Sequence, residues 1–143
     1  MLEGESARLA ALRGTDADFV LLTRRYEEMI ASHSQPDGIA SREHARLDHA
    51  FHLAVCEASH NPVLVHTLRS LTDLMLSTVF ASVNNLYHRP LQKRQIDRQH
   101  TRIYQAVIER LPDLALRAAR DHIHSIRDNL KDIEQEEQRL VRA

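Results

Sequence analysis

Four residues of types that bind metal ions stand out in this sequence: Asp48, His52, His100 and His122. Asp48 and His52 lie four positions apart, so on a helix their side chains share one face. His100 and His122 lie in two further segments with helical apolar periodicity. Three imidazoles and a carboxylate suit a divalent transition metal such as Zn, Ni or Mn. They would leave positions open on a five- or six-coordinate ion, where a small ligand could bind.

A packed core histidine is the simpler interpretation of each imidazole taken singly. A helical core nevertheless favours the neutral imidazole that binds metal, and a buried Asp48 would need a compensating cation. The set of four therefore carries the metal hypothesis. The remaining histidines are interpreted as surface, cap or loop residues: His33, His44, His49, His60, His66, His88 and His124.

A di-iron carboxylate site is a second possible interpretation of some of these residues. Glu57 and His60, like Asp97 and His100, have the acid-x-x-His spacing of di-iron carboxylate bundles. Such a site needs two Glu-x-x-His motifs and two further inward glutamates. Here the second motif carries Asp, His60 lies at a predicted helix end, and no convincing further pair of glutamates is visible. The sequence therefore favours the site with a single metal ion.

The composition indicates a single helical domain over residues 1–143. Hydrophobic residues make up 43% and charged residues 27%, with only 3 Gly and 4 Pro. A net charge of −1 does not favour a nucleic-acid-binding surface. The lone cysteine, Cys56, cannot form an internal disulfide and is interpreted as a packing residue in a reducing compartment. No transmembrane span or signal peptide is visible, so we expect a cytoplasmic chain without a membrane partner.

The apolar periodicity predicts an all-α fold, an antiparallel bundle of about six helices. Thr15 and Asp18 resemble a capping motif, and Gly14 is a plausible helix end. Pro62 and Pro90 suit first helical turns. The predicted helices cover residues 2–13, 16–33, 42–59, 62–86, 90–110 and 113–141. No helix-turn-helix with a basic recognition helix is found, and we expect the chain to be a piece of a longer protein.

Several segments, in this order and spacing, resemble the FCD domain, the all-helical effector-binding domain of FadR-type regulators in the GntR family. The segment from Asp48 to His52 (DHAFH) resembles the Asp-x-x-Phe-His signature of that family. The chain departs from the pattern at residues 111–113 (LPD), where the family often has Gly-Asp. The other matching segments are residues 2–11, 15–18, 58–64, 100–108 and 115–123.

The resemblance implies a function as well as a fold. It implies that Asp48, His52, His100 and His122 are the metal ligands, as in the metal-binding branch of the family. It also implies a homodimer, and DNA binding only through an N-terminal winged helix-turn-helix domain that is absent from this chain. The expected effector is a small organic acid whose carboxylate binds the metal.

The sequence offers candidates for further effector contacts and leaves two other functions open. Thr78 and Ser82 continue an apolar stripe with hydroxyl groups, which could face an effector or bond back to helical carbonyls. Arg8 is a further candidate for pairing with a carboxylate. A mononuclear metal-dependent enzyme would need a general base beside the metal, and no spare acidic residue clearly lines the same faces. A purely structural metal in an interaction module is the other alternative.

Overall fold

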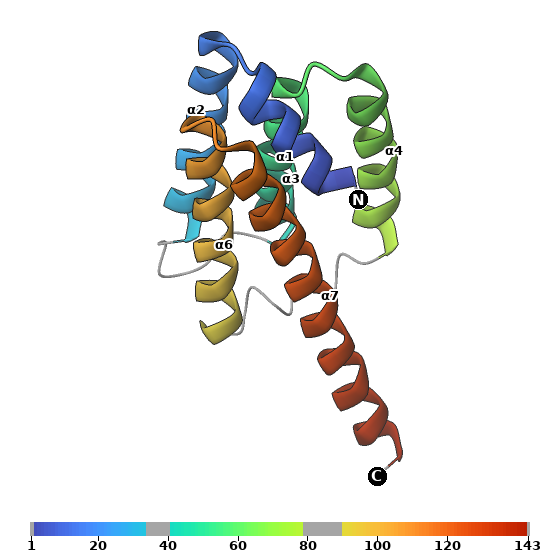
Figure 1. Ribbon diagram of the computed structural model, residues 1–143. Coiled ribbons are helices and arrows are strands. Elements are labelled where there is room, and N and C mark those ends of the chain that lie inside the picture. Colours follow the sequence, from blue (N-terminus) through green and yellow to red (C-terminus); the bar gives the residue numbers. More distant parts are fainter. Residues whose placement is uncertain (1, 34–40, 79–89, 143) are drawn as a thin grey trace.

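A computed structural model describes residues 2–33, 41–78 and 90–142 of the chain (Figure 1). It confirms the predicted all-α architecture, and no strand occurs within these ranges. The helices are α1 (Leu2–Arg13), α2 (Asp16–His33), α3 (Ser41–Ala58), α4 (Pro62–Thr78), α6 (Pro90–Ile108) and α7 (Pro112–Arg142). None of the described helices combines the length and apolar character needed to cross a bilayer.

Local hydrogen bonds explain where two of the helices begin. At the start of α2, the Asp18 N–H donates to Thr15 Oγ1 at 3.1 Å, and the Thr15 N–H donates to Asp18 Oδ2 at 2.8 Å. This is the reciprocal capping box that the sequence predicted, with Asp in place of Glu. At the start of α4, Asn61 Oδ1 accepts the Val63 N–H at 3.1 Å, and Pro62 takes the first helical position.

Some predicted boundaries were wrong by one or two residues. Helix α3 runs from Ser41 to Ala58 rather than over 42–59, because the chain turns at Ser59 and His60 has a φ of 53°. Helix α7 already begins at Pro112 and extends to Arg142. Helix α4 is described to Thr78, and the rest of the predicted segment 62–86 lies outside the described residues.

Helix α6 ends at Ile108 rather than at residue 110, because the chain turns there into a left-handed conformation. Arg110 has a φ of 57°, and the Leu111 N–H donates to the carbonyl of Ala106 at 2.9 Å. The Arg110 N–H donates to the carbonyl of Val107 at 3.0 Å. This pair of bonds is a Schellman motif, which usually places glycine where Arg110 stands. The departure from the family pattern at 111–113 therefore falls in the turn into α7.

The guanidinium of Arg110 joins that turn to the turn between α1 and α2. It donates to the carbonyls of Ala11 at 3.3 Å and Gly14 at 2.6 Å. Its central carbon also lies 4.6 Å from the centre of the Phe19 ring, a cation–π distance. These contacts fix the first helix against the end of α6.

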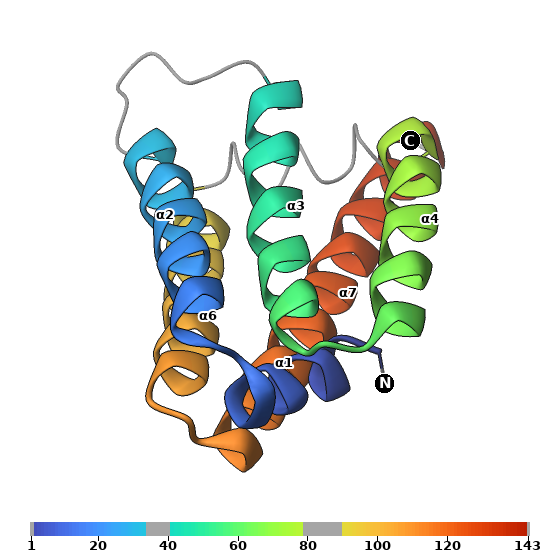
Figure 2. The same cartoon turned by 90° about the horizontal axis from the view of Figure 1, so that it is seen from above.

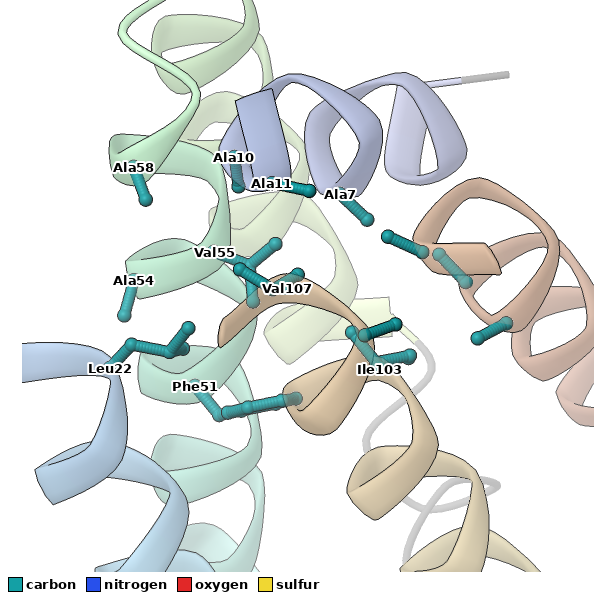
Figure 3. Close-up of a cluster of buried hydrophobic side chains, with 14 of the residues drawn as sticks. Ala7, Ala10, Ala11, Leu22, Phe51, Ala54, Val55, Ala58, Ile103 and Val107 are labelled. Atoms are coloured by element: carbon teal, nitrogen blue, oxygen red, sulfur yellow. The ribbon is translucent and has the colours of Figure 1, made fainter. Parts of the chain in front are cut away.

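The hydrophobic core lies where α1 runs across α3 and α6 (Figure 3). Small residues on α1 allow α7 to approach closely, and α1 packs against α7, α3 and α6. Cys56 is buried in this region, which confirms its interpretation as a packing residue. The labelled core side chains are Ala7, Ala10, Ala11, Leu22, Phe51, Ala54, Val55, Ala58, Ile103 and Val107.

The arrangement of the helices brings α3, α6 and α7 to the same part of the bundle. Figure 2 shows α3 in the middle of the row formed with α2 and α4, while α6 and α7 lie behind this row. Helix α6 packs along α7, and α1 bridges both of them to α3. Side chains from α3, α6 and α7 can therefore meet inside the bundle, although they are far apart in the sequence.

Candidate metal centre

The structure brings together three of the residues that the sequence singled out, His52, His100 and His122, and places Asp48 against two of them. Asp48 and His52 come from one face of α3, His100 from α6 and His122 from α7. Asp48 Oδ1 lies 2.9 Å from His100 Nε2 and 3.4 Å from His52 Nε2. Each of the three histidines offers a ring nitrogen, and these nitrogens lie within 4.8 Å of one another.

These separations fit a shared metal ion. Two ligand atoms that are each about 2.1 Å from an ion lie about 3.0 Å apart at right angles and about 3.4 Å apart at the tetrahedral angle. The contacts of Asp48 with His100 and His52 match those two spacings. The 4.8 Å spread of the imidazole nitrogens slightly exceeds the span of about 4.2 Å between opposite ligands. A small inward rotation of the rings would close that difference.

The centre is buried but not sealed. His100 is fully buried, and His122 is 3% exposed. The side chains of His52 and Asp48 keep 13% and 26% of their surface exposed. Oδ1 of Asp48 is itself buried, although the side chain as a whole is partly exposed. One side of the cluster, formed by Asp48 and His52, is therefore the side from which an ion and a small ligand could enter.

Within the cluster, the negative charge of Asp48 is balanced by the positive charge of His52. Burial opposes ionisation of Asp48, but the charge of His52 and hydrogen bonds from His100 and His52 hold the Asp48 pKa well below its ordinary value. Burial likewise opposes a charged His52, but Asp48, with a smaller contribution from Glu3, raises the His52 pKa to about 9. Burial and the charges of His100 and His52 lower the pKa of His122 well below its ordinary value. A bound cation could replace the proton that His52 holds.

Two neighbours of the cluster were missed by the sequence analysis. His122 Nδ1 lies 2.7 Å from Gln99 Oε1, and His52 Nδ1 lies 3.7 Å from Glu3 Oε2. Gln99 lies directly before His100 on α6, and a pattern of metal-ligand types does not include glutamine. Glu3 lies on α1, and only the packing of α1 against α3 brings it to the cluster.

The structure describes only in part the three residues that are candidates for binding the effector. Arg8 lies on α1 and forms an ion pair with Glu5, with Arg8 Nη2 at 2.5 Å from Glu5 Oε1. Thr78 is the last residue of α4, but its side chain lies outside the described residues. Ser82 also lies outside the described residues.

One histidine predicted at the surface proved to be buried. His44 occupies the same face of α3 as Leu47, Asp48 and Phe51, at the spacing of a buried helical stripe, so it faces the bundle. His60 and His66 are exposed as predicted, and His49 and His124 are partly buried. The side chains of His33 and His88 lie outside the described residues.

The first acid-x-x-His pair, Glu57 and His60, makes contacts outside the cluster. His60 Nε2 bonds to Asp18 Oδ2 at 2.6 Å at the start of α2. Glu57 Oε1 receives a hydrogen bond from the guanidinium of Arg69 at 3.1 Å. Neither Glu57 nor His60 belongs to the group formed by His52, His100 and His122.

Comparison with known proteins identifies the class of this chain. The sequence pattern of the FCD domain matches residues 1–125. The chain therefore belongs to the FCD domain family, as the motifs around Asp48 and His100 predicted. Relatives that match this chain are named as regulators of transcription, which favours a regulatory domain over the alternative of a metal-dependent enzyme.

Curated relatives carry the same assignment. The chain is 65% identical to the Glc operon transcriptional activator of Escherichia coli K12 over 143 residues, which are 100% of this chain and 56% of the activator. It is 31% identical to the putative L-lactate dehydrogenase operon regulatory protein of Escherichia coli K12 over 141 residues, 99% of this chain and 52% of that protein. It is 30% identical to the HTH-type transcriptional regulator LutR of Bacillus subtilis 168 over 131 residues, 91% of this chain and 58% of LutR. The chain thus spans about half the length of these relatives.

Proposed function

We propose that this domain binds one divalent metal ion, Zn, Ni or Mn, through Asp48, His52, His100 and His122. The observation that carries the proposal is the convergence of three imidazoles from three helices within 4.8 Å, with Asp48 Oδ1 at 2.9 Å and 3.4 Å from two of them. Nitrogen and oxygen donors of this kind suit those ions. The burial of His100 and His122 supports it further, since solvent does not compete for their nitrogens.

We propose that the bound ion holds the carboxylate of a small organic acid. The ion would supply positive charge and open coordination positions, and the chain would shape the surrounding pocket. Asp48 and His52 form the partly exposed side, where the acid would enter. Thr78, Ser82 and Arg8 are our candidates for further contacts with the acid. Arg8 would have to exchange its present partner Glu5 for the effector carboxylate.

In the full-length protein, this domain is proposed to control a DNA-binding domain at its N-terminus within a cytoplasmic homodimer. The regulator names of the relatives and their greater length support this proposal. Effector binding can change DNA binding only if the acid has different affinities for two arrangements of the helices. Helices α3, α6 and α7 would carry the change, because each provides at least one metal ligand.

Thermal unfolding of the domain tests the proposal. The protein is first loaded with Zn²⁺ and then mixed with a series of two- to four-carbon carboxylic acids, with the corresponding primary alcohols as controls. We expect at least one acid, and none of the alcohols, to raise the Tm of the loaded protein. We expect no rise for the metal-free protein or for a His122→Ala variant. Zn²⁺ binding without a response to any acid would contradict the sensor proposal and favour a purely structural metal.

A further inference from the structure

The orientation of the His122 ring is fixed from outside the cluster. Nδ1 of this ring lies 2.7 Å from Oε1 of Gln99, a strong hydrogen-bond distance. An amide oxygen only accepts, so Nδ1 carries the proton and Nε2 keeps its lone pair. The ring stacks on His52 and meets His100 edge-on, so it lies against both of the other imidazoles. Gln99 therefore selects the tautomer of His122 that a metal ion requires.

The His52 ring has an acidic neighbour from outside the cluster, at ion-pair distance. Its Nε2 lies 3.4 Å from Asp48 Oδ1 within the cluster. Its Nδ1 lies 3.7 Å from Oε2 of Glu3, which is within ion-pair distance. The side chains of His52 and Glu3 are both largely shielded from solvent, at 13% and 22% exposed. A carboxylate in this position favours a proton on Nδ1 and leaves Nε2 for a metal.

We infer that Gln99 and Glu3 are positioning residues of the metal centre, which hold His122 and His52 with Nε2 directed inward. This inference rests on the proposed metal binding by the four ligands. Metal-bound histidines commonly donate their second N–H to a carboxylate or carbonyl oxygen, which fixes the ring and strengthens it as a ligand. Loss of such a partner typically lowers metal affinity by about 10- to 100-fold.

The inference gives α1 a part in the centre, although α1 provides no ligand. Glu3 is the contact through which α1 meets His52, and α1 also packs against α6 and α7. Filling the metal site would therefore order α1 together with the three ligand-bearing helices. The position of α1 would in turn affect how tightly the metal is held.

The chain offers matched controls for both residues. Gln95 lies one helical turn before Gln99 and receives a hydrogen bond from Nδ2 of Asn129 at 3.4 Å, so it also joins α6 to α7. Glu5 lies on α1 like Glu3, but it pairs with Arg8 instead of a histidine. Each control removes the same type of side chain from the same helix without touching the cluster.

The experiment measures Zn²⁺ affinity by competition with a chromogenic chelator for the native domain and four variants. We expect Gln99→Ala and Glu3→Ala each to weaken Zn²⁺ binding by about tenfold or more. We expect Gln95→Ala and Glu5→Ala to bind Zn²⁺ like the native domain. Gln99→Glu, which keeps an acceptor at the same place, should restore affinity to at least the native level.

A second measurement distinguishes a change in the positions of the metal ligands from a loss of folding. The visible absorption of bound Co²⁺ reports the ligand geometry, and we expect its spectrum to shift in Gln99→Ala but not in Gln95→Ala. Equal Zn²⁺ affinity and identical Co²⁺ spectra for native, Gln99→Ala and Glu3→Ala proteins would overturn the inference while leaving the metal site intact. Absence of Zn²⁺ binding by the native domain would overturn the proposed function, and this inference with it.

Discussion

Oδ1 of Asp48 lies 2.9 Å from Nε2 of His100, and both atoms are buried. This contact joins α3 to α6 at the centre of the candidate site. A buried carboxylate oxygen is costly unless a cation or strong donors compensate it. In the metal-free protein, the charged His52 and the hydrogen bonds from His52 and His100 compensate Asp48, and a divalent ion would do so more fully.

Replacing Asp48 by asparagine keeps the size of the side chain and removes its charge. We expect Asp48→Asn to lower Zn²⁺ affinity by at least about tenfold, because a neutral amide oxygen is a poorer ligand for a dication than a carboxylate oxygen. Chelator competition measures the change. Glu43→Gln is the control, since Glu43 lies on the same helix and pairs with Arg46. Equal Zn²⁺ affinity for the native protein and Asp48→Asn would show that Asp48 is not a ligand.

The capping box of α2 predicts a pH-dependent contribution to stability. Burial opposes ionisation of Asp18, but hydrogen bonds from Thr15 and His60 outweigh it and lower the Asp18 pKa below its ordinary value. We expect Asp18→Ala to reduce the free energy of unfolding at pH 7 by about 1 kcal/mol, as for other N-terminal caps. Denaturation in urea measures this loss, and Asp16→Ala, in the same helical turn, is the control.

The sign of the pH dependence follows from the lowered pKa. The folded protein binds fewer protons at Asp18 than the unfolded chain, so the carboxylate stabilises the fold above its ordinary pKa of 3.8. That contribution is lost as the pH falls through the lowered folded value. The difference between native protein and Asp18→Ala should therefore shrink below about pH 4. A difference that grows on acidification would refute this account of the cap.

Substitution by alanine is expected to have opposite effects on stability at Gly4, in α1, and at Gly14, in the turn that follows α1. A Cβ at Gly14 would lie 2.3 Å from Cε1 of Phe19 and 2.7 Å from the carbonyl of Ala10, so Gly14→Ala should destabilise the domain by about 1–3 kcal/mol. Gly4 lies within α1, and a Cβ at Gly4 would lie 3.4 Å from the carbonyl of Leu116 on α7, which is an acceptable contact distance. Gly4→Ala should be neutral or stabilising by up to about 1 kcal/mol. Urea denaturation of both variants checks the pair, and equal effects would contradict it.

Arg110 combines a strained backbone with stabilising side-chain contacts. Arg110→Ala should destabilise the domain by about 1–3 kcal/mol, because it removes hydrogen bonds to two carbonyls and the contact with Phe19. Arg110→Gly loses the same contacts but relieves the positive φ, so it should be about 1 kcal/mol more stable than Arg110→Ala. Thermal unfolding distinguishes them, and a glycine variant less stable than the alanine variant would exclude backbone strain at this turn.

The helices and the four candidate ligands could be predicted from the sequence because both depend on short-range patterns. Apolar periodicity locates each helix, and residues such as Thr15 and Pro62 locate where helices begin. The spacing of Asp48 and His52 places them on one face before any fold is known. His100 and His122 are candidates because of their residue type and the apolar periodicity around them, the family resemblance implies the same two residues, and the structure places both near His52.

The surroundings of the site could not be predicted in the same way. Glu3 reaches His52 only because α1 crosses α3, and Gln99 reaches His122 only because α6 lies along α7. Such contacts depend on how helices pack in three dimensions, which periodicity does not specify. His44 is predicted as a surface, cap or loop residue, since histidine as a type does not indicate burial, whereas its position on α3 buries it.

Elemental analysis of the purified domain tests the central claim most directly. The measurement compares the native chain with a His100→Ala/His122→Ala double variant after both are exposed to Zn²⁺ and freed of excess metal. The account predicts about one zinc ion per native chain and almost none in the double variant. No zinc in the native protein, or equal zinc in both proteins, would contradict the assignment of Asp48, His52, His100 and His122 as a metal centre.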